Sequence, residues 1–130
     1  MCNSLIVGAI KMGLSISIAT PKNYKVDSTI VKWASENGII EITDDVNKAV
    51  ENSDIVYTDV FSSMGMENEK EQRLKDFSNF CVNSKLMKKA KKDAIVLHCL
   101  PAHREEEISE EILELHSKEI FEQADRKSVV

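Results

Sequence analysis

Apolar residues follow two spacings along the chain. Residues 2–12 carry them three and four positions apart and are followed by Gly13, which predicts a helix that ends at this glycine. Residues 15–19 instead alternate polar and apolar side chains before Pro21, which predicts a strand. The same two patterns predict further strands at residues 39–43, 55–57 and 94–97, and further helices at residues 28–37, 46–50 and 84–91.

This alternation of strands and helices predicts an α/β protein. Strands joined by helices form parallel sheets with helices on both faces, so we expect a Rossmann-like doubly wound fold. Such a sheet normally begins with its central strand, and here the chain opens on a helix. We therefore expect an incomplete sheet without its central first strand, in which four strands form two pairs. Exposed strand edges favour pairing with another chain, so we also expect self-association.

Length and charge narrow the class of protein. A chain of 130 residues is long enough for one domain with a core. Its net charge of −5 disfavours binding to nucleic acid, because the phosphate backbone would repel it. The basic residues at 85–92 are interpreted as a solvated helix face, and Glu105–Glu107 as the first turn of a helix, where carboxylates stabilise the positive end of the dipole.

The sequence does not predict a membrane or extracellular protein. No apolar run approaches the roughly 20 residues of a membrane span, and the first residues lack the pattern of a signal peptide. Three cysteines without a Cys-x-x-Cys pair do not form a disulfide framework. We therefore expect a cytoplasmic protein without a membrane partner.

Two polar segments follow predicted strands. One is Thr-Asp-Val-Phe-Ser-Ser-Met-Gly at residues 58–65, and the other is His-Cys-Leu-Pro at residues 98–101. The carboxyl ends of parallel strands meet at one edge of a sheet, where α/β proteins bind ligands. Together the segments resemble the C-terminal, ornithine-binding half of the ornithine carbamoyltransferase family, which carries Thr-Asp-x-Trp-x-Ser-Met-Gly and His-Cys-Leu-Pro in this order. Phe61 stands where the family usually has Trp, and Cys99 favours the ornithine branch over the aspartate branch, whose turn reads His-Pro-Leu-Pro.

The resemblance implies a function in two parts. Residues 1–130 correspond to a truncated ornithine-binding domain, and the family's N-terminal carbamoyl-phosphate domain is absent. The intact enzyme of arginine biosynthesis converts carbamoyl phosphate and ornithine to citrulline and phosphate, without a cofactor. We expect the isolated chain to bind ornithine but to be inactive, and to meet carbamoyl phosphate only with a complementing N-terminal half.

The resemblance also implies roles for individual residues. Cys99 would accept the proton of the attacking amine, and a thiol with a pKa near 8.5 that a cationic ligand can lower is suited to this task. Asp59 would hold the α-ammonium group of ornithine, because a buried ammonium must be paired. Ser63 through its hydroxyl, Met64 through its backbone and Leu100 through its carbonyl would complete the ornithine site.

Arg126 is a candidate for binding carbamoyl phosphate. A guanidinium suits phosphate, and the family has an arginine in the segment Glu-Ala-Glu-Asn-Arg. Here residues 123–126 read Gln-Ala-Asp-Arg, one residue short of that pattern.

Other interpretations stay open from the residues alone. Cys99 is also compatible with an inert buried cysteine, and Asp59 with a turn cap. His98, His103 and Cys99 could form part of a zinc site, but no fourth ligand is evident, so we expect no metal. His98 and Cys99 are neighbours on an extended strand and should point to opposite faces, which argues against a Cys-His nucleophile.

Two other functions compete with the leading one. The first is a non-catalytic amino-acid-binding or interaction remnant. The second is a fragment of a carbamoyltransferase that acts on a related amine, such as putrescine or an acylated ornithine.

Overall fold

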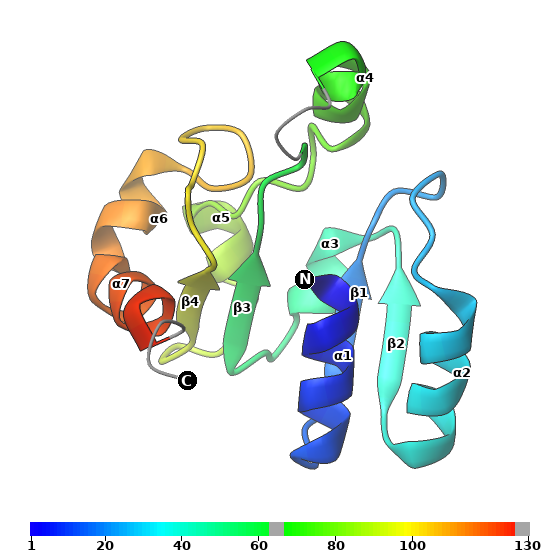
Figure 1. The fold of residues 1–130 in the computed structure, drawn as a ribbon. Helices are drawn as coiled ribbons and strands as arrows, with labels where there is room; N and C mark the ends of the chain where they lie inside the picture. The colour runs from blue at the N-terminus through cyan, green and yellow to red at the C-terminus, as the bar shows by residue number, and fades with distance from the viewer. Residues whose placement is uncertain (63–66, 127–130) are drawn as a thin grey trace. The chain divides into compact units, whose positions relative to one another are not determined.

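The computed structural model describes residues 1–62 and 67–126, and the chain divides into two compact units, Met1–Ala49 and Val50–Val130 (Figure 1). Each unit contains one parallel two-stranded sheet, with order β1-β2 in the first and β3-β4 in the second. The expected α/β class and the arrangement of four strands in two pairs are therefore confirmed.

The first unit packs two helices against one sheet. Its elements are α1 (Cys2–Lys11), β1 (Ile16–Ala19), α2 (Ser28–Asn37), β2 (Ile40–Thr43) and most of α3 (Val46–Val50). The side chains of Ile6, Ile10 and Ala34 form its buried centre, where α1 contacts α2.

Local sequence explains both ends of α2. The Asp27 carboxylate caps the helix by accepting hydrogen bonds from the N–H groups of Thr29 (2.9 Å) and Ile30 (3.2 Å). At the other end, a Cβ atom on Gly38 would lie 2.8 Å from Cδ1 of Ile10. Glycine therefore allows the chain to leave the helix close to the buried face of α1.

The second unit carries both motif segments. Its elements are β3 (Ile55–Thr58), α4 (Glu67–Asp76), α5 (Ser84–Met87), β4 (Ile95–His98), α6 (Glu110–Leu115) and α7 (Ser117–Arg126). β3 and β4 pair in register from Ile55↔Ile95 to Thr58↔His98. α7 packs against β4 and α6, as the red and gold ribbons of Figure 1 show.

Several features of this unit differ from the sequence pattern. The helix predicted at residues 84–91 already ends at Met87, and α7 was not predicted. α4 was not predicted, because Leu74 is its only apolar residue and no helical stripe exists to reveal it. The placement of Glu105–Glu107 in a first helical turn was wrong. These residues form a turn after Arg104, with Glu105 at φ 64°, and α6 begins only at Glu110, capped by the Ser109 hydroxyl.

The described helices include none with the length and apolar character that a bilayer crossing requires.

Candidate functional site

Strand register brings Asp59 and Cys99 together. Thr58 and His98 are the last paired residues of β3 and β4, so Asp59 and Cys99 follow at the same edge and on the same face of the sheet. The Cys99 thiol donates a hydrogen bond to Oδ1 of Asp59 at 3.0 Å, and the same oxygen accepts the Val60 N–H at 2.7 Å. Both side chains are half-buried. An acidic group and a thiol thus share one partly accessible site.

Tyr57 and Gln123 extend this cluster. Tyr57 lies two residues before Asp59 and therefore on the same face of β3. Its hydroxyl interacts electrostatically with Cys99 and accepts a long hydrogen bond (3.5 Å) from Nε2 of Gln123 on α7. Burial, followed by the nearby Cys99 and Asp59, raises the pKa of Tyr57 to about 12. The phenol is therefore neutral over the physiological pH range.

His98 points to the opposite face, as expected for a neighbour of Cys99 on a strand. The imidazole is fully buried, and its Nε2 lies 2.7 Å from Oε1 of Glu107. Its Nδ1 accepts the Leu100 N–H at 2.9 Å, so the ring proton is on Nε2 and is donated to Glu107. Both ring nitrogens are thus used to shape the His-Cys-Leu-Pro turn.

Glu107 is the fully buried anion of this network. Burial raises the pKa of its carboxyl, but hydrogen bonds from His98, from the His103 N–H (2.8 Å) and from its own N–H outweigh burial, so the pKa lies below its ordinary value. The carboxylate therefore stays charged and joins residues 98 and 103 across the turn. Within that turn Leu100 adopts φ 52° and precedes a cis peptide bond to Pro101.

The acidic, histidine and cysteine groups do not combine into one metal site. Among the described residues, ligand atoms within 4.8 Å of one another form two separate trios, which are Asp59 with His98 and Cys99, and His103 with Glu106 and Glu107. In the first trio both nitrogens of His98 are already hydrogen-bonded. Two available ligands are fewer than the three or four of protein zinc sites.

The loop that leaves β3 is anchored by α4. Nη1 of Arg73 donates to the carbonyl oxygen of Phe61 at 3.1 Å, and the Phe61 ring stacks on Phe77 with centroids 4.7 Å apart. Ser63 and Met64 lie outside the described residues. The backbone of Arg126 ends α7, but its side chain is outside the described part, so its suggested role stays a prediction.

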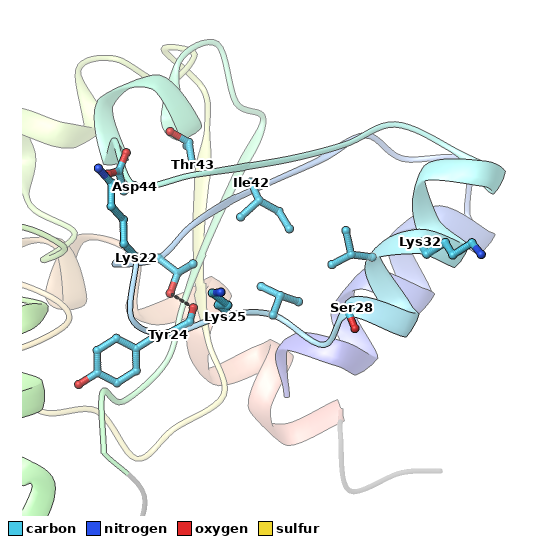
Figure 2. Close-up of a pocket in the computed structure, with 11 residues that line it drawn as sticks. Lys22, Tyr24, Lys25, Ser28, Lys32, Ile42, Thr43 and Asp44 are labelled. Carbon is cyan, nitrogen blue, oxygen red and sulfur yellow. Dashed lines mark hydrogen bonds and ion pairs between the residues drawn. The ribbon is translucent and has the colours of Figure 1, made fainter.

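A cavity of about 660 Å³ lies elsewhere, within Met1–Ala49, at the ends of β1 and β2 (Figure 2). Its apolar wall includes Ile42, and its rim includes Lys22, whose ammonium group is 3.4 Å from Asp44. Figure 2 shows Lys32 extending away from the apolar wall. This cavity is open to solvent and contains no residue of the segments 58–65 and 98–101. The cluster of Asp59 and Cys99 is therefore the better candidate site.

Sequence reasoning missed three residues of the site region, which are Tyr57, Glu107 and Gln123. Strand alternation could have indicated Tyr57, since it precedes Asp59 by two positions. Glu107 and Gln123 carry no local signal, because each reaches its partner through folding of a distant segment.

The chain was compared with known proteins by sequence and by structure. The family model for the aspartate/ornithine carbamoyltransferase Asp/Orn-binding domain matches residues 1–130. An ornithine carbamoyltransferase of Nitratiruptor sp. is 48% identical over 132 residues, which cover 98% of this chain and 43% of that protein.

Two solved structures are similar over most of the chain. The anabolic ornithine carbamoyltransferase of Campylobacter jejuni has 46% identity and a TM-score of 0.91, over 96% of this chain and 43% of that chain. The Pyrococcus furiosus ornithine carbamoyltransferase has 40% identity and a TM-score of 0.88, over 96% and 42%. The chain spans less than half the length of these relatives. The likeness confirms the resemblance of the two motifs, and the chain belongs to the aspartate/ornithine carbamoyltransferase family, to whose Asp/Orn-binding domain residues 1–130 correspond.

Proposed function

We propose that residues 1–130 are the ornithine-binding domain of an ornithine carbamoyltransferase. Together with a carbamoyl-phosphate-binding half, the domain would form citrulline and phosphate from ornithine and carbamoyl phosphate in the cytoplasm. The observation that supports this proposal most strongly is the contact between the Cys99 thiol and the Asp59 carboxylate, 3.0 Å apart at the ends of two paired strands.

Asp59 is suited to the α-ammonium group of the amino acid. Its carboxylate is half-buried, where a charge-assisted hydrogen bond is stronger than in water. The arriving ammonium replaces the weak Cys99 thiol as a donor to this carboxylate. Ligand binding and release of the thiol are therefore coupled at one oxygen atom.

Cys99 is suited to the proton that the reaction releases. The ornithine side-chain amine forms a bond to the carbonyl carbon of carbamoyl phosphate, the bond from that carbon to the phosphate oxygen breaks, and the amine proton passes to the Cys99 thiolate. A cation bound nearby favours the thiolate form. The Leu100 carbonyl would accept a hydrogen bond from the same amine, and the Ser63 hydroxyl and the Met64 backbone are further candidate contacts to ornithine.

Catalysis also requires that both substrates are held in contact. Transfer reactions of this kind depend on positioning and on stabilising the developing charge, so a chain that binds ornithine alone should not accelerate transfer. Arg126 is a candidate contact to the phosphate. We predict no citrulline formation by the 130-residue chain, and turnover after addition of a separately expressed carbamoyl-phosphate-binding half. Self-association of the chain also stays a prediction.

Isothermal titration with L-ornithine tests the binding site directly. We expect heat of binding with the parent chain and at least a tenfold weaker Kd in Asp59→Asn, because losing a hydrogen bond to a charged group costs about 1.5–3 kcal/mol. Asp54→Asn is the matched control, since Asp54 precedes the same strand and pairs on the surface with Lys91 at 2.8 Å. Cys81→Ser is the control for Cys99→Ser, because both thiols are half-buried.

Two results would contradict the proposal. One is the absence of ornithine binding by the folded parent chain together with no turnover after complementation. The other is an equal loss of affinity in Asp59→Asn and Asp54→Asn, which would assign the effect to net charge rather than to this site.

A further inference from the structure

We propose that Tyr57 and Gln123 are positioning residues for Cys99, acting through a directional chain of hydrogen bonds that stabilises the Cys99 thiolate. The proposal deepens the proposed function, on which the catalytic meaning of Cys99 rests. The acidity of the thiol itself can be measured without any substrate.

Strand geometry places the three acting groups on one face. Tyr57 and Asp59 are two positions apart and therefore point to the same face of the sheet. Cys99 lies beside Asp59, one residue beyond the last paired residues of β3 and β4. Tyr57 pairs with Leu97 across the two strands, so it lies diagonal to Cys99, and its hydroxyl interacts electrostatically with that side chain. Cys99 therefore has a carboxylate on one side, at 3.0 Å, and a phenol on the other.

Gln123 determines the direction in which the phenol donates. Its Nε2 donates to the Tyr57 oxygen at 3.5 Å, so that oxygen acts as an acceptor toward α7. A phenol has a single O–H donor, which is then left for the sulfur of Cys99. Hydrogen bonds run from Gln123 to Tyr57 and from Cys99 to Oδ1 of Asp59, and donation from the Tyr57 hydroxyl to Cys99 would complete the chain.

The chain has a different effect on each form of Cys99. As a thiol, Cys99 donates to Asp59, so the Tyr57 hydroxyl adds little. As a thiolate, it is repelled by the Asp59 carboxylate, and the Tyr57 hydroxyl becomes a donor to the new negative charge. The phenol can keep this role because burial first, and then Cys99 and Asp59, hold its pKa near 12.

An amine bound at Asp59 would favour the thiolate form of Cys99. The ammonium group neutralises the carboxylate that disfavours the thiolate, while the Tyr57 donor stays in place. Tyr57 thus offsets the unfavourable neighbour Asp59, and Gln123 on α7 keeps the phenol aligned from a segment 66 positions away in the chain.

The pH profile of thiol alkylation tests the proposal. In a Cys2→Ser/Cys81→Ser background Cys99 is the single thiol, and its rate of reaction with iodoacetamide is measured by intact mass from pH 6 to pH 10. Tyr57→Phe should raise the midpoint of this pH profile by about one pH unit, which lowers the rate of Cys99 alkylation near neutral pH about tenfold. Gln72→Leu, which removes an exposed amide that donates to Asp76 at 3.0 Å, should leave the profile unchanged.

A double-mutant cycle separates alignment from simple charge. Gln123→Glu offers a carboxylate that accepts the Tyr57 proton and turns the donor away from sulfur, so it should also raise the midpoint. In the Tyr57→Phe background the same substitution should have a much smaller effect, because the phenol through which it acts is gone. If Tyr57→Phe does not fold by circular dichroism, Gln123→Leu carries the test, with a midpoint rise of a few tenths of a unit.

Unchanged midpoints in Tyr57→Phe and Gln123→Leu would overturn the proposal. An equal effect of Gln123→Glu with and without the phenol would also overturn it, in favour of direct charge repulsion. Because the assay contains no ornithine, failure of ornithine binding would leave this result standing. An unchanged profile would likewise leave the ornithine site intact.

Discussion

Replacement of Glu107 by alanine should destabilise the unit Val50–Val130 by about 2–4 kcal/mol. Oε1 of Glu107 accepts the His98 Nε2–H at 2.7 Å and the His103 N–H at 2.8 Å. Without the carboxylate the buried imidazole donor has no partner, which costs about 1–3 kcal/mol. The His103 residue is exposed, so water can replace its acceptor, and that loss adds about 1 kcal/mol.

Urea denaturation followed by circular dichroism measures the change in unfolding free energy. Native-state hydrogen exchange then localises it, because the amides of β4 should lose protection more than those of β1. Glu107→Gln retains a carbonyl acceptor for both donors and should cost only about 1 kcal/mol. Glu106→Ala is the matched control, since the Glu106 side chain forms long ion pairs with Lys70 (3.8 Å) and His103 (3.9 Å). It should change stability by about 0.5 kcal/mol or less.

The reasoning would be refuted by equal stabilities of Glu107→Ala and Glu106→Ala. It would also be refuted if Glu107→Gln were as damaging as Glu107→Ala, because the acceptor geometry would then be irrelevant. A general loss of protection in both units would indicate global unfolding rather than local loss of the buried network.

Two further predictions concern pH and helix capping. The pKa of Glu107 is lowered in the folded state from its ordinary value of 4.5, so the unfolded chain takes up the proton first as pH falls. The stability that this carboxylate contributes is fully present above pH 4.5 and declines as pH falls through the lower folded pKa. Urea denaturation measured at several pH values should show a flatter decline in Glu107→Gln. Asp27→Ala removes the acceptor for two N–H groups at the start of α2 and should cost about 1 kcal/mol, measured by thermal denaturation, whereas Asp27→Ser should recover most of it; equal losses in both would contradict the capping role.

The pairing of Asp59 with Cys99 was accessible from the sequence because it depends on short-range rules. Each residue follows an apolar strand, and parallel strands end at a common edge. The opposite orientation of His98 followed from the same alternation. The contact of Asp59 with Cys99 needed only the additional assumption that these two strands are neighbours.

Glu107 shows where local rules fail. A run of three glutamates before a helix has the composition of a first turn, and the charge pattern gave no reason to expect one of them inside the protein. The buried His98 imidazole decides the outcome, because its Nε2–H requires an acceptor and Glu107 supplies one. The acidic residues of the first turn of α6 are instead Glu110 and Glu111.

Sequence by itself determined the four strands, the helices of the first unit, the parallel pairing class and the two strand ends that carry Asp59 and Cys99, because these follow from side-chain periodicity along a continuous segment. Tertiary structure decided the environment of those groups. The Gln123 amide, the Tyr57 hydroxyl and the Glu107 carboxylate act on β4 from other parts of the chain. Their hydrogen bonds depend on distances that only packing creates, so no local pattern encodes them.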